Sequence, residues 1–158
     1  MTMFETGLYE IARLFLLPVL VLILVALIYS FWSLGRFAME AWQRRRPGYV
    51  SPLAVHHRKT GCASPDLELW IVQHLEWLRI VARSAPMLGL VATMIPMGPA
   101  LLALSRNEAQ GVGENMVVAF SAVVLALVSA SIAFFVLTFR RRWLLQELRR
   151  IEIAREAA

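Results

Sequence analysis

Acids and bases are absent from three long apolar stretches of this 158-residue chain, residues 14–34, 87–104 and 116–139. The chain has one cysteine, Cys62, which argues against a disulfide framework and against a four-ligand zinc site. The sequence contains no glycine-rich phosphate loop and no nucleophile paired with a base. We therefore expect neither an enzyme nor a cofactor-binding protein.

Metal ligands are also few. His56, His57 and Cys62 stand in a segment rich in proline, glycine and serine, without a fourth ligand at a recognisable spacing. We interpret them as solvated loop residues and predict no metal site.

Hydrophobic residues make up 59% of the chain and charged residues 17%. A soluble domain of this size has too little interior to bury so much apolar surface, so the composition predicts an integral membrane protein. The net charge of +5 does not indicate nucleic-acid binding, because the basic residues adjoin the apolar stretches. In that position they normally set membrane topology.

Each apolar stretch is long enough to form one membrane-spanning helix. The sequence therefore predicts an all-α fold with three transmembrane helices, the second and third joined by the short turn 105–113. Residues 36–83 hold eight Arg or Lys residues and the tail from Arg140 holds six, whereas the two other flanks hold one each. This bias predicts that the N-terminus and the turn lie outside, and that the middle segment and C-terminus lie in the cytoplasm.

The expected organisation has five parts. A short extracytoplasmic N-terminus (1–13) precedes the first transmembrane helix (14–34), and a cytoplasmic linker with a stalk helix (35–84) follows. The stalk is expected to begin at Ser64 and to run into the second span. A hairpin of the second and third transmembrane helices (85–139) comes next, followed by a cytoplasmic basic helical tail (140–158).

Small residues gather on one face of each helix of the hairpin. Such a face permits close helix contact or lines a narrow passage. Two prolines in the second span either admit water at a kink or produce a packing bend. The residues assigned to packing or kinking are Gly89, Ala92, Pro96, Pro99, Ala122, Ala126 and Ser129.

Two arginine triplets flank the spans. We interpret them first as cytoplasmic anchors, with binding of anionic membrane lipid as a second role. The six residues are Arg44, Arg45, Arg46, Arg140, Arg141 and Arg142.

The second span opens with a recognisable motif, Ala85-Pro86-Met87-Leu88-Gly89-Leu90-Val91-Ala92-Thr93. It resembles the Ala-Pro-x-Leu-Gly-Leu-x-Gly-Thr pattern of the MotA/TolQ/ExbB proton channel family, with Ala92 in place of the second glycine. In the third span Val118-Ala119-Phe120-Ser121 is similar to the motif of a small prokaryotic branch, and Ser121 stands where the family places a second hydroxyl. A glutamate that some members carry would fall on Met116.

The resemblance implies a multi-pass subunit of a bacterial or archaeal cytoplasmic membrane. It further implies a homopentamer around a single-span partner of the ExbD/TolR/MotB type, whose intramembrane aspartate carries the proton. The spans themselves hold hydroxyls but no group that binds a proton near neutral pH. Thr93 and Ser121 are the candidate pore residues, and for both the alternative is a hydrogen bond to a backbone carbonyl one turn earlier.

We therefore predict a proton-channel subunit, resembling a stator, in a motor driven by proton motive force. The alternatives are a non-conducting membrane scaffold and an accessory subunit of a transport system. The residues do not decide between proton and sodium.

Overall fold

The computed structural model describes residues 3–44, 53, 55, 64–106 and 108–156. The helices are α1 (Met3–Gln43), α3 (Ser64–His74), α4 (Glu76–Ser105) and α5 (Ala109–Glu156). Those residues include no strand, and α1, α4 and α5 are each long and apolar enough to cross a membrane. The prediction of an all-α protein with three candidate membrane-spanning helices is confirmed.

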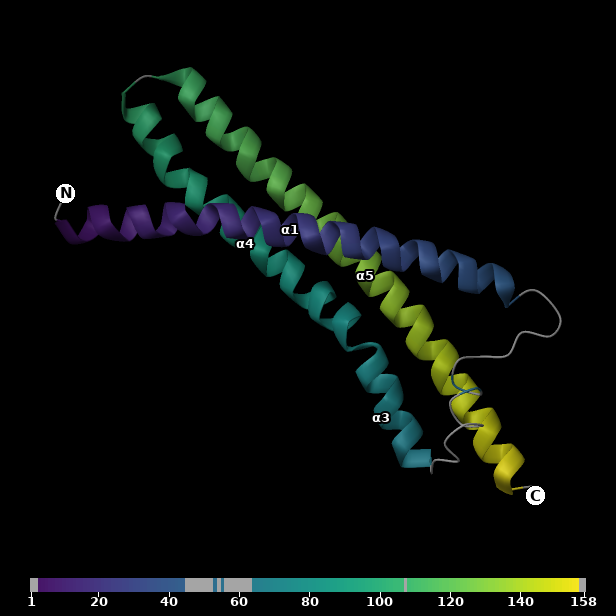
Figure 1. Ribbon diagram of the computed structural model, residues 1–158. Coiled ribbons are helices and arrows are strands. Elements are labelled where there is room, and N and C mark those ends of the chain that lie inside the picture. The colour runs from purple at the N-terminus through teal and green to yellow at the C-terminus, as the bar shows by residue number, and fades with distance from the viewer. Residues whose placement is uncertain (1–2, 45–52, 54, 56–63, 107, 157–158) are drawn as a thin grey trace.

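Helices α4 and α5 run antiparallel as a hairpin, and α1 crosses over it at an angle (Figure 1). The link between them is shorter than the expected turn 105–113, because α5 already begins at Ala109. Two amides close the end of α4: those of Arg106 and Glu108 both donate to the carbonyl of Ala103, at 3.2 and 3.0 Å. These bonds satisfy a terminal carbonyl within the turn and so allow a tight connection.

Small side chains form the contact between α4 and α5. A methyl group built on Gly89 would lie 2.9 Å from Cβ of Ala126, so the two backbones are as close as glycine permits. Lipid tails are as apolar as the helices themselves, and therefore close packing rather than hydrophobicity holds such helices together. The buried alanines along the contact are Ala85, Ala92, Ala100 and Ala103 on α4, and Ala119, Ala122, Ala126, Ala130 and Ala133 on α5.

Helix α1 packs on one side of the hairpin. Its Val19 and Ile23 form a buried cluster with Ala92 of α4 and with Ala122 and Ala126 of α5. Further along α1, the buried side chains continue at intervals of three and four residues, with Ala26, Ser30 and Ser33. This spacing places them on one stripe, as expected for a helix that contacts its neighbours along a single seam.

Helix α3 packs against the last part of α5. Leu67, Ile71 and Leu75 form a buried cluster with Leu144 and Leu148, and Leu53 completes it. At 48 residues α5 is about 72 Å long, more than twice the roughly 30 Å of a hydrocarbon core. Helix α5 is therefore longer than one membrane crossing requires, and burial of apolar side chains stabilises its contact with α3.

The stalk differs from the uninterrupted helix that the sequence predicts. The chain bends at Leu75, whose backbone dihedrals are φ −99° and ψ 0°, so that α3 and α4 are separate helices. The amide of Leu75 still donates to Ile71 and that of Arg79 to Leu75. Leu75 itself is buried in the cluster with α5, which shows that tertiary contact accompanies the bend.

Candidate functional site

Thr93 and Ser121 lie at similar heights in the antiparallel hairpin. Gly89 contacts Ala126, and Ala92 lies in one cluster with Ala122, so three residues along α4 correspond to four in the opposite direction along α5. Counting along both helices from these pairs shows that Thr93 and Ser121 lie at the same height along the hairpin, to within one residue. Both hydroxyls thus belong to the middle of the hairpin rather than to its ends.

The two hydroxyls do not face each other within one chain. Leu88 of α4 packs against the buried cluster that contains Val19 and Ile23 of α1. Thr93 is rotated about 140° around the axis of α4 from Leu88. Thr93 therefore lies on the side of α4 away from α1. Ser121 is about 140° round α5 from Ala126, and so it lies on the edge of α5 that faces away from α4.

Each hydroxyl donates its hydrogen to a backbone carbonyl one turn earlier. Oγ1 of Thr93 lies 2.7 Å from the oxygen of Leu90, and Oγ of Ser121 lies 2.7 Å from that of Val117. The hydroxyl oxygen keeps lone pairs that accept hydrogen bonds. In this state both hydroxyl oxygens can accept a hydrogen bond from water or from a neutral carboxylic acid. They cannot donate a hydrogen bond to either unless the intrahelical bond breaks.

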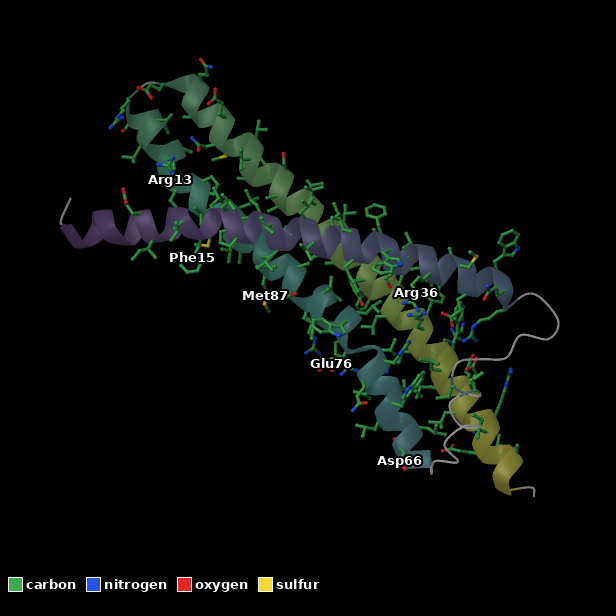
Figure 2. All side chains as sticks on the ribbon, in the orientation of Figure 1. Arg13, Phe15, Arg36, Asp66, Glu76 and Met87 are labelled. Carbon is green, nitrogen blue, oxygen red and sulfur yellow. The ribbon has the colours of Figure 1, made fainter. Side chains whose placement is uncertain are left out.

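Proline residues of α4 border a cavity of about 330 Å³ near the turn end of the bundle. Arg13 and Leu16 of α1 and Asn115 of α5 also line it, and Figure 2 shows Arg13 where α1 passes α4. Pro96 and Pro99 release the carbonyls of Ala92 and Ile95, because proline has no amide hydrogen. The cavity lies on the α1 side of α4, however, whereas Thr93 lies on the other side.

Charged residues connect the far end of α1 to α5. Arg140 donates from Nε and Nη2 to Oε2 of Glu40, at 3.1 and 2.8 Å. Arg44 pairs with Glu40 at 3.3 Å and with Glu147 at 2.8 Å, and its guanidinium lies over the ring of Trp143. The paired side chains are only 13–19% exposed. Arg44 and Arg140, both expected as lipid anchors, thus take part in an internal ion-pair cluster.

A smaller cavity of about 220 Å³ adjoins this cluster and is bordered by Arg36, His74 and Arg140. Figure 2 shows Arg36 on the second half of α1. Burial lowers the pKa of His74, and the positive charges of Arg140 and Arg36 lower it further, while Glu40 acts in the opposite direction. The ring of His74 also stacks on Trp70 at a centroid distance of 4.8 Å. His74 therefore favours its neutral form on the wall of this cavity.

A hydrogen-bonded pair that the sequence reading missed joins α1 to α5. Oγ of Ser30 lies 2.9 Å from Oγ of Ser129 and 3.0 Å from the carbonyl oxygen of Ser129, and both side chains are fully buried. A signal for Ser30 does exist in the sequence. Positions 19, 23, 26, 30 and 33 carry the smaller or β-branched residues of a leucine-rich helix at alternating steps of four and three.

Some expected features lie outside the described residues, namely Arg45, Arg46, His56, His57 and Cys62. Within the described part of the chain, no group of three or more His, Cys, Asp or Glu residues is placed to hold a metal ion. The hairpin residues expected to pack, to kink the helix or to line a pore all lie within the helices α4 and α5.

The region that forms α3, α4 and nearly all of α5 can be compared with known families. Residues 66–153 match the family model of the MotA/TolQ/ExbB proton channel family. The chain belongs to this family. The match covers more than half of the chain and includes both Thr93 and Ser121, but it does not include α1. Comparison with curated proteins and with solved structures gives no match. Family membership makes the chain a membrane subunit of the proton-channel type.

Proposed function

We propose that the chain is the channel subunit of a motor driven by proton motive force, and that several copies surround the helix of a single-span partner. The observation that carries the proposal is the position of Thr93. It belongs to the family motif, lies at mid-hairpin and occupies the side of α4 that α1 leaves uncovered. If several copies form a ring with α1 on the outside, the side of α4 that carries Thr93 faces the centre of the ring.

The proton carrier comes from the partner in this proposal. The stretches 14–34, 87–104 and 116–139 contain no acid or base, so a proton cannot be held there near neutral pH by this chain. An aspartate in the helix of an ExbD/TolR/MotB-type protein would supply the missing group. Its neutral form donates a hydrogen bond, and Thr93 presents an acceptor because its own hydrogen is bound to Leu90.

The chemistry assigned to Thr93 follows from this match of donor and acceptor. A hydroxyl that only accepts stabilises a protonated carboxyl group directly, but a carboxylate only through a water molecule. Thr93 therefore assists the step in which the neutral aspartate passes through the membrane. Ser121, on the outer edge of α5, offers the same acceptor to a neighbouring subunit or to a water file at the same level.

The arrangement of the ends supports the proposed membrane orientation. Arg13 borders a cavity with Pro99 and Asn115, so the start of α1 and the α4–α5 turn share one end of the bundle. Glu40, Arg140 and Glu147 share the other end with the arginine-rich part of α5. We assign the second end to the cytoplasm, following the excess of basic residues. We further propose a homopentamer by likeness to the family.

Proton flux through the reconstituted complex tests the two hydroxyls. Thr93→Val and Ser121→Ala each remove one acceptor, and we expect the flux to fall about five- to tenfold, in line with the loss of one hydrogen bond. Thr138→Val and Ser131→Ala are matched controls, because these hydroxyls also bind a carbonyl one turn earlier, at 2.8 Å. The control variants are expected to retain their flux. If Thr93→Val conducts like its control, the pore assignment is wrong and a non-conducting scaffold becomes the better interpretation.

A further inference from the structure

A groove of about 620 Å³ lies between α4 and the last part of α5, on the side of the hairpin away from α1. Four arginines border it, together with apolar residues and two neutral polar ones. Its lining consists of Arg79 from α4, and of Phe134, Leu137, Thr138, Arg141, Arg142, Leu145, Gln146 and Arg149 from α5. None of these four arginines belongs to the ion-pair cluster of α1.

The charge of the groove is uncompensated in the described structure. The ion pairs formed within residues 3–44, 64–106 and 108–156 involve Arg44 and Arg140, whereas Arg79, Arg141, Arg142 and Arg149 form none. The fold therefore divides the arginine triplet 140–142 between two sides of α5. Arg140 is neutralised by Glu40, while its neighbours Arg141 and Arg142 point their charge into a groove that holds no acid.

Along α5, the lining of the groove changes from mainly apolar residues to mainly arginines. Phe134 and Leu137 belong to the apolar stretch 116–139, whereas the arginines of α5 follow this stretch. From Phe134 to Arg149 the helix rises about 22 Å, enough to reach from the hydrocarbon region through the headgroup region. A ligand that fills this groove must itself change from apolar to anionic along its length.

We propose that the groove binds an anionic phospholipid. The arginines hold its phosphodiester, for which guanidinium groups are the preferred partners, and the acyl chain lies along Phe134 and Leu137. A second copy of this chain offering acidic side chains is the competing occupant, but it would use only the arginines. Lipid binding matches both the apolar and the cationic residues of the groove, and the change from one to the other along α5.

The test compares two double variants of the full chain, purified as its oligomer in neutral detergent. Arg79→Gln/Arg149→Gln removes two groove charges. Arg83→Gln/Arg150→Gln removes two charges from exposed positions on the same helices that do not line the groove. The two variants have identical composition and net charge. Retention of phosphatidylglycerol, with phosphatidylcholine as the neutral comparison, is measured by mass determination of the intact complex during a lipid titration.

The groove variant is expected to bind phosphatidylglycerol about 25-fold more weakly, or about fivefold for each arginine lost. The control variant should change the affinity less than about threefold, and phosphatidylcholine binding should be unaffected in both. Soluble glycerol 3-phosphate should not displace the lipid, because it lacks the acyl chain. Arg142→Gln/Arg149→Gln, which alters only exposed positions on α5, gives the same test should Arg79→Gln disturb α4.

Equal weakening in the groove and control variants would show a general charge effect and overturn the proposal. Unchanged phosphatidylglycerol affinity in the groove variants would overturn it as well. If that unchanged affinity came with a smaller oligomeric mass, the groove would be a contact for the acidic side chains of a second copy. None of these outcomes depends on proton conduction, so the proposed channel function stands or falls separately.

Discussion

The closest approach between α4 and α5 gives a sharp prediction for Gly89. A methyl group at this position would lie 2.9 Å from Cβ of Ala126, well inside van der Waals contact, while the next atoms, of Val123, are 3.7 and 3.9 Å away. The obstructing atom is attached directly to the backbone and cannot rotate away. We therefore expect Gly89→Ala to push the two helices apart at mid-hairpin.

The size of the effect follows from two opposing terms. Overpacking of a close contact costs about 1–3 kcal/mol, and alanine is better than glycine within a helix by about 0.5–1 kcal/mol. Gly89→Ala should therefore destabilise the folded protein by about 1 kcal/mol. Because a single methyl group causes the clash, Ala126→Gly in the same chain should relieve it. The double variant Gly89→Ala/Ala126→Gly moves this methyl group from α5 to α4 and should be close to wild type.

Unfolding in mixed detergent micelles, followed by circular dichroism, measures these differences. Gly113→Ala is the matched control, because Gly113 lies in α5 with no atom within 4 Å of the added methyl group, and it should be neutral or stabilising. The reasoning is refuted if Gly89→Ala behaves like Gly113→Ala, or if Ala126→Gly fails to restore stability in the double variant.

Two further contacts give predictions for the attachment of α1. Ser30→Ala and Ser129→Ala should each destabilise the protein, with a coupling of about 0.6 kcal/mol in a double-mutant cycle, because the two side chains share one buried hydrogen bond. Ser131→Ala, which alters an exposed side chain, is the control. A coupling energy of zero between Ser30 and Ser129 would contradict the contact. Glu40→Gln leaves Arg140 and Arg44 without their shared carboxylate and should cost about 1–3 kcal/mol of unfolding free energy. The control is Glu10→Gln, at an exposed position of the same helix, which should change the unfolding free energy by less than about 0.5 kcal/mol. An equal loss of unfolding free energy in Glu40→Gln and Glu10→Gln would mean that the ion pairs contribute nothing to stability.

Local sequence patterns were sufficient for the main elements of the hairpin. Uninterrupted apolar stretches predict the spans, and the small residues at Gly89, Ala122 and Ala126 fall on the faces that meet in the structure. Thr93 is a candidate pore residue because it completes a motif, and this motif lies in the region that matches the family.

Features that depend on distant residues could not be predicted in this way. Glu40 and Arg140 are 100 positions apart, and nothing near either residue indicates that they pair. The arginine triplet 140–142 is uniform in sequence, yet helical rotation directs Arg140 towards α1 and its neighbours into the groove opposite. The bend at Leu75 likewise coincides with a tertiary contact that no local signal reveals.

Mass determination of the intact complex, after co-purification with single-span proteins of the same membrane, tests the proposed channel function most directly. We predict a ring of this chain, five copies by likeness to the family, around a partner whose spanning helix carries an aspartate. Thr93→Val should preserve this assembly while reducing its proton flux. A monomer, or a ring that captures no such partner, would leave the chain without a proton carrier and would contradict the proposal.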